Sequence, residues 1–124
     1  MVSNRHFNEI VNGGWRALAY ERFREGIEVY WLEKGTSTGP AVAILKYQPG
    51  ARVPHHRHAG LETIIVLDGV QSDENGDYAA GTVVLNAVGS EHSVWTKEGC
   101  TVLIQWNLPV IFFGDGKRVF DHAV

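Results

Sequence analysis

Cysteine is nearly absent from the sequence: Cys100 is the only one among 124 residues. One cysteine can form neither an internal disulfide nor the thiolate-rich coordination of many structural zinc sites. Any metal site in this chain must therefore use nitrogen and oxygen ligands. Beside Gly99, Cys100 itself is most simply a small apolar residue on a strand, and the alternative is an oxidation target.

Basic residues are also few. Eleven Lys and Arg stand against fourteen Asp and Glu, which gives a net charge of −3. Such a balance, with scattered basic residues, lacks the positive patch that nucleic acids require. No apolar run is long enough to span a bilayer, and residues 1–6 lack the apolar core of a signal sequence. We expect no nucleic acid partner, no membrane association and a cytoplasmic location.

What is present fits one globular domain over residues 1–124, with 44% hydrophobic and 20% charged residues. Short apolar runs separated by glycine-containing turns predict an all-β fold, and their spacing favours a sandwich or a closed barrel. Residues 1–10 are the only candidate for a short helix. Residues 110–113 are apolar on both faces, which predicts that they cap the barrel or contact a second subunit. The predicted strands are residues 15–20, 27–32, 41–47, 62–67, 82–86, 92–96 and 101–106.

Histidine and glutamate gather in one segment, which contains His56, His58 and Glu62, and His92 follows later in the chain. Side chains two residues apart on a strand share a face, so His56 and His58 point to the same side. His55 must then point to the opposite side, near the barrel rim, and the alternative is a role beside the site. The pattern indicates a site with three imidazoles and one carboxylate.

Two glycine-bounded segments carry these residues at fixed spacings. The first, within residues 50–69, contains Gly50, His56, His58, Glu62 and Gly69; the second, within residues 81–96, contains Gly81, Ala87, Gly89 and His92. In both motifs the chain resembles the cupin superfamily. The resemblance implies an all-β, single-domain cupin barrel (a jelly roll, or double-stranded β-helix) with one divalent metal ion on His56, His58, Glu62 and His92. Ala87 and Thr96 depart from the usual proline and asparagine of the second motif, and neither position is a ligand.

Within that superfamily, residues 66–82, 89–92 and 98–100 are similar to the cupin-like domain of the anti-sigma factor ChrR. Regulators of that type also carry an N-terminal sigma-binding domain with its own His and Cys zinc ligands. The residues before Gly26, where the similarity begins, contain no cysteine. We therefore expect a function other than sigma-factor inhibition by that route.

Three neutral imidazoles and one carboxylate around a divalent ion leave a local charge of about plus one, which attracts anionic oxygen ligands. Iron, zinc, manganese and nickel all suit this ligand set. The resemblance favours a small metal-dependent oxygenase of carbonyl or diketone compounds. Its substrate would be a small anionic or enolisable molecule, and Glu62 would leave the metal to act as a base. The alternative is a non-catalytic, metal-bound sensor or regulatory cupin related to ChrR. Either form is expected to be a homodimer.

Overall fold

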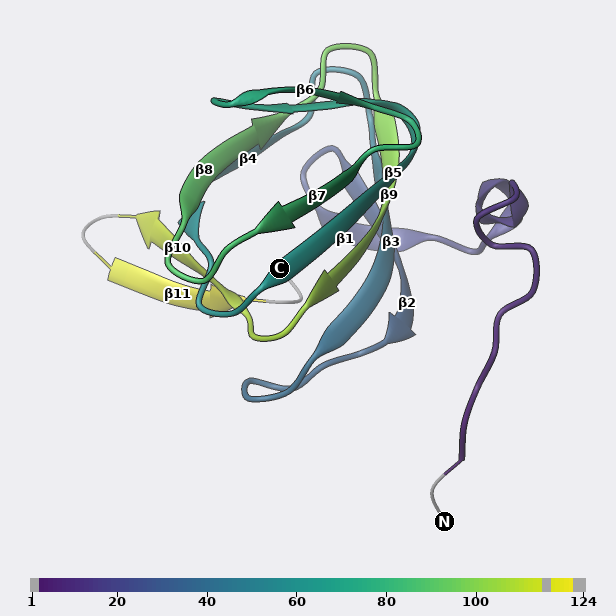
Figure 1. The fold of residues 1–124 in the computed structure, drawn as a ribbon, viewed down its shortest axis with the longest axis horizontal. Helices are drawn as coiled ribbons and strands as arrows, with labels where there is room; N and C mark the ends of the chain where they lie inside the picture. The colour runs from purple at the N-terminus through teal and green to yellow at the C-terminus, as the bar shows by residue number, and fades with distance from the viewer. Residues whose placement is uncertain (1–2, 115–116, 122–124) are drawn as a thin grey trace.

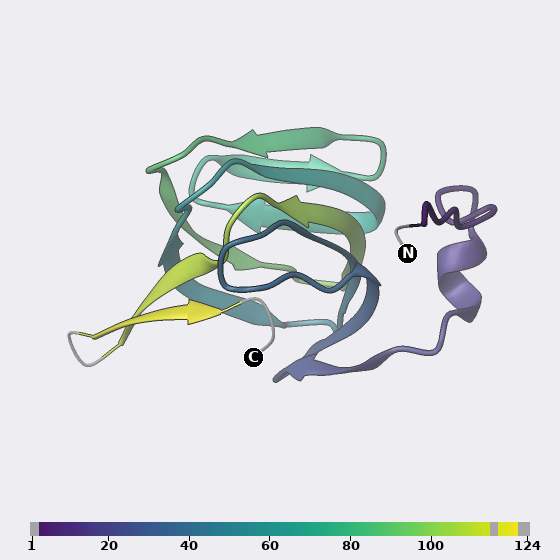
Figure 2. The same ribbon diagram turned by 90° about the horizontal axis from the view of Figure 1, so that it is seen from below.

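The computed structural model describes residues 3–114 and 117–121 and shows antiparallel strands curled into a barrel (Figures 1 and 2). One sheet has the order β1-β2-β3-β9-β5-β7, and the other joins β11, β10, β4, β8, the end of β5, and β6. The strands are β1 (Glu21–Arg24), β2 (Ile27–Glu33), β3 (Ala41–Tyr47), β4 (Arg52–Arg57), β5 (Glu62–Asp73), β6 (Gly76–Ala79), β7 (Val83–Asn86), β8 (Glu91–Trp95), β9 (Cys100–Trp106), β10 (Val110–Gly114) and β11 (Lys117–Asp121).

The core lies between the two sheets and follows the alternation of apolar residues along the strands. On β3, for example, Ala41, Ala43, Leu45 and Tyr47 are all buried, as expected for every second side chain of a strand that faces a core. Six of the predicted strands are confirmed, with ends that shift by a few residues: β2, β3, β5, β7, β8 and β9.

The predicted strand at residues 15–20 is wrong. The chain instead forms a short 3-10 helix, η1 (Gly14–Ala17). Gly13 has a φ of 118°, a conformation that glycine adopts readily, and the backbone N–H of Gly14 donates to the carbonyl of Glu9 at 2.8 Å. Trp15 lies in this helical turn and is buried. Its apolar side chain therefore indicated burial correctly, but the backbone is helical and not extended. The described part of residues 1–10 forms no helix.

Residues 110–113 form part of the barrel, and their contact with a second subunit stays a prediction. They lie on β10, which pairs with β4 on one side and β11 on the other. Val110 and Ile111 are buried, and Phe112 packs against the core. The sequence prediction did not include β1, β4, β6, β10 or β11 as strands. Among the described residues, no helix has the length and apolar character needed to cross a membrane.

Strand β5 changes which of its residues face inward. Its register against β9 shifts between Val66 and Asp68. Before the shift Glu62 and Val66 are buried, and after it Gln71 and Asp73 are buried. An irregularity of this kind inserts a residue into one strand and reverses the direction of the side chains beyond it. Both halves of β5 therefore send polar side chains into the barrel.

Gly69 permits this irregularity. Its φ is 74°, in the left-handed region, and a Cβ at this position would lie 2.2 Å from the carbonyl oxygen of Gly99. Only glycine meets both requirements, so the glycine that ends the first sequence motif fixes the path of β5.

Candidate metal centre

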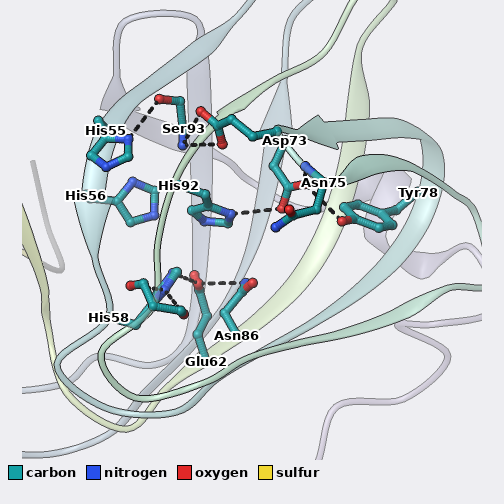
Figure 3. A network of polar contacts seen from close by, with 12 residues as sticks. His55, His56, His58, Glu62, Asp73, Asn75, Tyr78, Asn86, His92 and Ser93 are labelled. Atoms are coloured by element: carbon teal, nitrogen blue, oxygen red, sulfur yellow. Dashed lines mark hydrogen bonds and ion pairs between the residues drawn. The ribbon is translucent and has the colours of Figure 1, made fainter.

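The four predicted ligands meet inside the barrel. His56, His58, Glu62 and His92 each offer one ligand atom, and these atoms all lie within 4.8 Å of one another. Their side chains point toward a common centre in Figure 3. All four residues are buried, with no more than 4% of their surface exposed. His56 is on β4, His58 directly follows it, Glu62 begins β5 and His92 is on β8, where it pairs with His56.

Hydrogen bonds orient the first two imidazole rings. The Nδ1 of His56 lies 2.9 Å from the carbonyl oxygen of Pro54. The Nδ1 of His58 lies 3.1 Å from the carbonyl oxygen of Ser90 and 2.9 Å from its hydroxyl. A carbonyl only accepts, so each ring carries its proton on Nδ1 and donates it outward. The Nε2 lone pairs then face the centre, as a metal requires.

The third ring is oriented by a buried carboxylate. The Nδ1 of His92 donates to Oδ2 of Asp73 at 2.9 Å (Figure 3). The other oxygen of Asp73 accepts from the backbone N–H of Asn75 at 2.8 Å and from the hydroxyl of Tyr78 at 2.9 Å. Burial raises the pKa of Asp73, but the hydrogen bonds from His92, Asn75 and Tyr78 together lower it by more than burial raises it. The pKa of Asp73 therefore lies below its ordinary value.

The position of Asp73 behind His92 was not predicted from the sequence. An aspartate beside Asn75 and Gly76 is typical of a hairpin turn, and the chain does turn there between β5 and β6. Asp73 stands two residues after Gln71, so the two side chains point to the same face of β5. That this face is the inner one follows only from the register shift in β5.

Unpartnered atoms indicate that the cluster fits a cation. The Nε2 atoms of His58 and His92 are buried without a hydrogen-bond partner. The Nε2 of His58 nevertheless lies 2.5 Å from Oε2 of Glu62. Because its proton is on Nδ1, this contact brings two acceptor atoms together, and they repel each other unless a cation lies between them. The residues present therefore fit a divalent metal.

The charge states also suit a metal. Burial lowers the pKa of His56 to about 4, although the negative charge of Glu62 opposes the shift. Burial raises the pKa of Glu62, but contact with His58 and the neighbouring imidazoles lowers it more, so it lies below its ordinary value. At neutral pH the cluster thus contains a neutral His56 and an ionised carboxylate. The side-chain N–H of Asn86 donates to Oε2 of Glu62 at 3.1 Å.

A cavity of about 30 Å³ adjoins the cluster, and His56 and Glu62 form part of its wall. This volume suits about one water molecule. Aromatic and aliphatic side chains form most of the wall, and Phe23, Arg24, Val53 and Phe112 are the partly exposed ones, so the cavity approaches the surface between β1, β4 and β10. The remaining lining residues are Ile27, Leu45, Tyr47, Ile64, Gln71, Val94, Ile104, Trp106 and Val110.

Two residues named in the sequence analysis lie apart from the cluster. The side chain of His55 is half exposed, and its Nε2 lies 3.0 Å from Oε1 of Glu91, so it points away from the cluster, as the strand alternation predicts. Cys100 is 3% exposed. Burial raises the pKa of its thiol to about 11, which agrees with a small core residue and makes a reactive thiolate unfavourable.

Known proteins resemble the chain in both sequence and fold. It is 35% identical over 77 residues to the anti-sigma-E factor ChrR of Cereibacter sphaeroides, an alignment that covers 60% of this chain and 36% of that protein. The chain spans about a third of the length of the curated relatives it matches. A crystal structure of ChrR with SigE from Rhodobacter sphaeroides is 25% identical, with a TM-score of 0.64 over 73% of this chain and 49% of that chain.

An acetylacetone dioxygenase from Acinetobacter johnsonii has a TM-score of 0.77, with 19% identity over 96% of this chain and 85% of that chain. At this identity the likeness shows the fold alone, and it confirms the predicted cupin barrel. The sequence pattern described as the ChrR cupin-like domain matches residues 12–108. This match covers most of the chain, and the chain belongs to the family of ChrR cupin-like domains.

Proposed function

We propose that this chain is a mononuclear metal-dependent dioxygenase that cleaves small β-diketone-type compounds beside a carbonyl group. The observation that carries the proposal is the cavity wall, which includes His56 and Glu62. The cavity holds about one water molecule, so a diketone would reach His56 and Glu62 only if partly exposed side chains of the wall, such as Phe23 and Phe112, moved aside. A purely structural metal site is closed by protein ligands and needs no adjoining space.

His56, His58, Glu62 and His92 would hold one divalent ion, with iron, zinc, manganese and nickel as candidates. When bound, an iron-type ion supplies Lewis-acid polarisation of a carbonyl oxygen and redox access to dioxygen. The hydrogen bonds on the three Nδ1 atoms keep the rings in position for this role. The chain itself thus provides orientation before any substrate enters.

Glu62 would move the proton. Its carboxylate is ionised and forms part of the cavity wall, so it is placed to take the acidic proton between two carbonyl groups and leave an enolate. Cleavage by one dioxygen then breaks one carbon–carbon bond and gives a carboxylic acid and an α-dicarbonyl fragment. Both oxygen atoms enter the products and the electrons come from the substrate, so no external reductant is needed. The apolar walls keep water away from the enolate.

Anaerobic titration of the iron-loaded protein with acetylacetone tests the proposal. We expect a spectral change that saturates with substrate, followed on admission of air by uptake of one dioxygen per diketone. The variant His56→Ala should lose both responses, and His55→Ala, a change to the neighbouring half-exposed histidine, should keep them. Absence of a spectral change and of oxygen uptake across a panel of β-diketones would remove this function.

The family match favours a second candidate, a zinc-bound regulatory module. Relatives of this family include ChrR, which has been solved in complex with SigE. Metal analysis of the protein as purified separates the two: one iron or manganese per chain supports catalysis, and tightly held zinc supports regulation. The regulatory candidate also requires that peroxide or singlet oxygen change the metal content or the oligomeric state.

A further inference from the structure

Arg24 is the permanently charged cation in the cavity wall, and the register of β1 places it there. The pairing of β1 with β2 shifts between Arg22 and Arg24, and beyond the shift Arg24 lies directly opposite Ile27. Ile27 is a buried core residue. Residues directly opposite each other in an antiparallel pair share a face of the sheet, so Arg24 points toward the barrel interior and lines the cavity. Irregularities of this kind often redirect a side chain beside a functional site.

The guanidinium of Arg24 forms no ion pair with any carboxylate among the side chains that the structure describes. Its positive charge lies instead over the ring of Phe112, 4.5 Å from the ring centre. Both residues are partly exposed. At such a position a cation–π contact is weak compared with a hydrogen bond between charged groups. An anion at the mouth of the cavity would therefore replace Phe112 as the partner of Arg24.

Phe112 also lies beside the metal cluster, because its ring centre is 5.5 Å from that of His56. Strand β10, which carries Phe112, pairs with β4 at two positions, and β1 pairs with β2 alone among the described strands. The seam between β1 and β10 is thus closed by side chains and not by backbone hydrogen bonds. A partly exposed side chain changes its rotamer quickly, so Phe112 can move aside without breaking a strand pair.

Movement of Phe112 would give the cavity the space that a substrate needs. The closed cavity of about 30 Å³ holds about one water molecule. A molecule the size of benzene fits a cavity of about 150 Å³, and a small β-diketone is of similar size to the phenyl ring of Phe112. Displacement of that ring therefore frees space of the order that the diketone fills, and this space lies beside His56.

We propose that Arg24 is a specificity-determining residue that binds the carboxylate of an anionic β-diketone at the seam between β1 and β10, and that Phe112 is the gate it releases. The inference rests on the proposed function, because it names a substrate class for the same site. The carboxylate takes the place of the Phe112 ring on the guanidinium, and the ring leaves the cavity wall. The diketone end of the molecule then reaches His56 and Glu62. A neutral diketone lacks the group that exchanges with Phe112.

The test titrates anaerobic, iron-loaded protein with acetylpyruvate, a β-diketone with a carboxylate, and with acetylacetone, which has none. The saturating spectral change gives the Kd of each ligand. In Arg24→Gln we expect the Kd of acetylpyruvate to rise at least about tenfold, the effect of losing a hydrogen-bonded charge pair, and the Kd of acetylacetone to stay near the wild-type value. Arg22→Gln is the matched control. Arg22 is exposed on β1 and lies outside the cavity wall, so both Kd values should stay unchanged.

Two further variants separate recognition from a merely structural role. Arg24→Lys keeps the positive charge and should bind acetylpyruvate more tightly than Arg24→Gln does. Phe112→Leu keeps an apolar side chain without the ring, so both ligands should associate faster than with the wild type in stopped-flow measurements. An unchanged association rate would overturn the role of Phe112 as a gate. Equal rises in the Kd of both ligands in Arg24→Gln would mean that Arg24 only maintains the cavity, and would overturn its role in recognition.

Failure of this inference is distinguishable from failure of the proposed function. If the wild type binds both diketones and Arg24→Gln binds acetylpyruvate equally well, the role of Arg24 is wrong and the proposed function stands. If the wild type binds acetylacetone but not acetylpyruvate, the substrate class is wrong and the proposed function again stands. If the wild type binds no member of the β-diketone panel, the proposed function and the role of Arg24 are both refuted.

Discussion

Replacing Asp73 by asparagine exchanges one acceptor atom for a donor behind His92. In the wild type, Oδ2 of Asp73 accepts the ring proton of His92 at 2.9 Å, and both side chains are at most 5% exposed. The other oxygen already accepts from Asn75 and Tyr78. An asparagine keeps those two bonds through its single oxygen, so its amide N–H₂ must face Nδ1 of His92.

Two donors cannot share this contact, so the His92 ring must change its tautomer. The proton moves from Nδ1 to Nε2, the atom that faces the centre of the cluster, and the lone pair needed for a metal is lost. In a catalytic carboxylate–histidine pair, the same aspartate-to-asparagine exchange lowers the reaction rate because the histidine adopts the wrong tautomer. Loss of such an orienting partner typically weakens metal binding by about 10- to 100-fold, or about 1.4 to 2.7 kcal/mol. We expect Asp73→Asn to fall in this range.

The assay is competition for zinc against a chelator of known affinity, with nitrogen-15 NMR of the metal-free protein to assign the His92 tautomer. Tyr78→Phe is the matched control. It removes a hydrogen bond from the same carboxylate and reverses no donor, so it should weaken zinc binding less. Equal losses in Asp73→Asn and Tyr78→Phe, or a ring that keeps its proton on Nδ1 in Asp73→Asn, would refute the reasoning.

Two further predictions concern pH and assembly. Because the thiol of Cys100 has a pKa of about 11 when folded against an ordinary 9.0, the folded state holds its proton more tightly. This contribution, on the order of 2 kcal/mol, is complete below pH 9 and lost as the pH rises to 11. Urea unfolding across that range should show that the free energy of unfolding falls more steeply with pH in the wild type than in Cys100→Ala. Equal pH dependence in the two proteins would contradict this prediction. For assembly, β7 pairs only with β5 among the described strands, and its Val83 and Leu85 are 58% and 63% exposed. We expect a homodimer through this edge, so light scattering should give twice 13.7 kDa, and Leu85→Lys should give the single mass with unchanged metal content. A wild type that is monomeric at micromolar concentration would exclude the dimer.

The sequence predicted those parts of the fold and site that depend on local periodicity. Alternation of apolar residues located six strands, and the parity of His56 and His58 placed both rings in the barrel. It failed at Trp15, because a glycine pair allowed a helical turn where the apolar residues alone indicated a strand. Strands β1 and β6 each contain only one large apolar or aromatic residue, Phe23 and Tyr78, which is too few for a periodic signal.

The partners behind the cluster depend on tertiary structure. Asp73 lies 19 residues from His92, and no pattern along the chain connects a turn aspartate to a histidine on another strand.

The sequence by itself determined the four candidate ligands, because a fixed spacing between glycines and alternating side chains is a local property of the chain. Only the tertiary structure decided what surrounds them. The register shift after Val66 reverses the side-chain directions of β5 and turns Gln71 and Asp73 inward. Such a shift arises from packing against β9 and from the close approach of Gly69 to Gly99. These are contacts between distant segments, which residue order alone does not reveal.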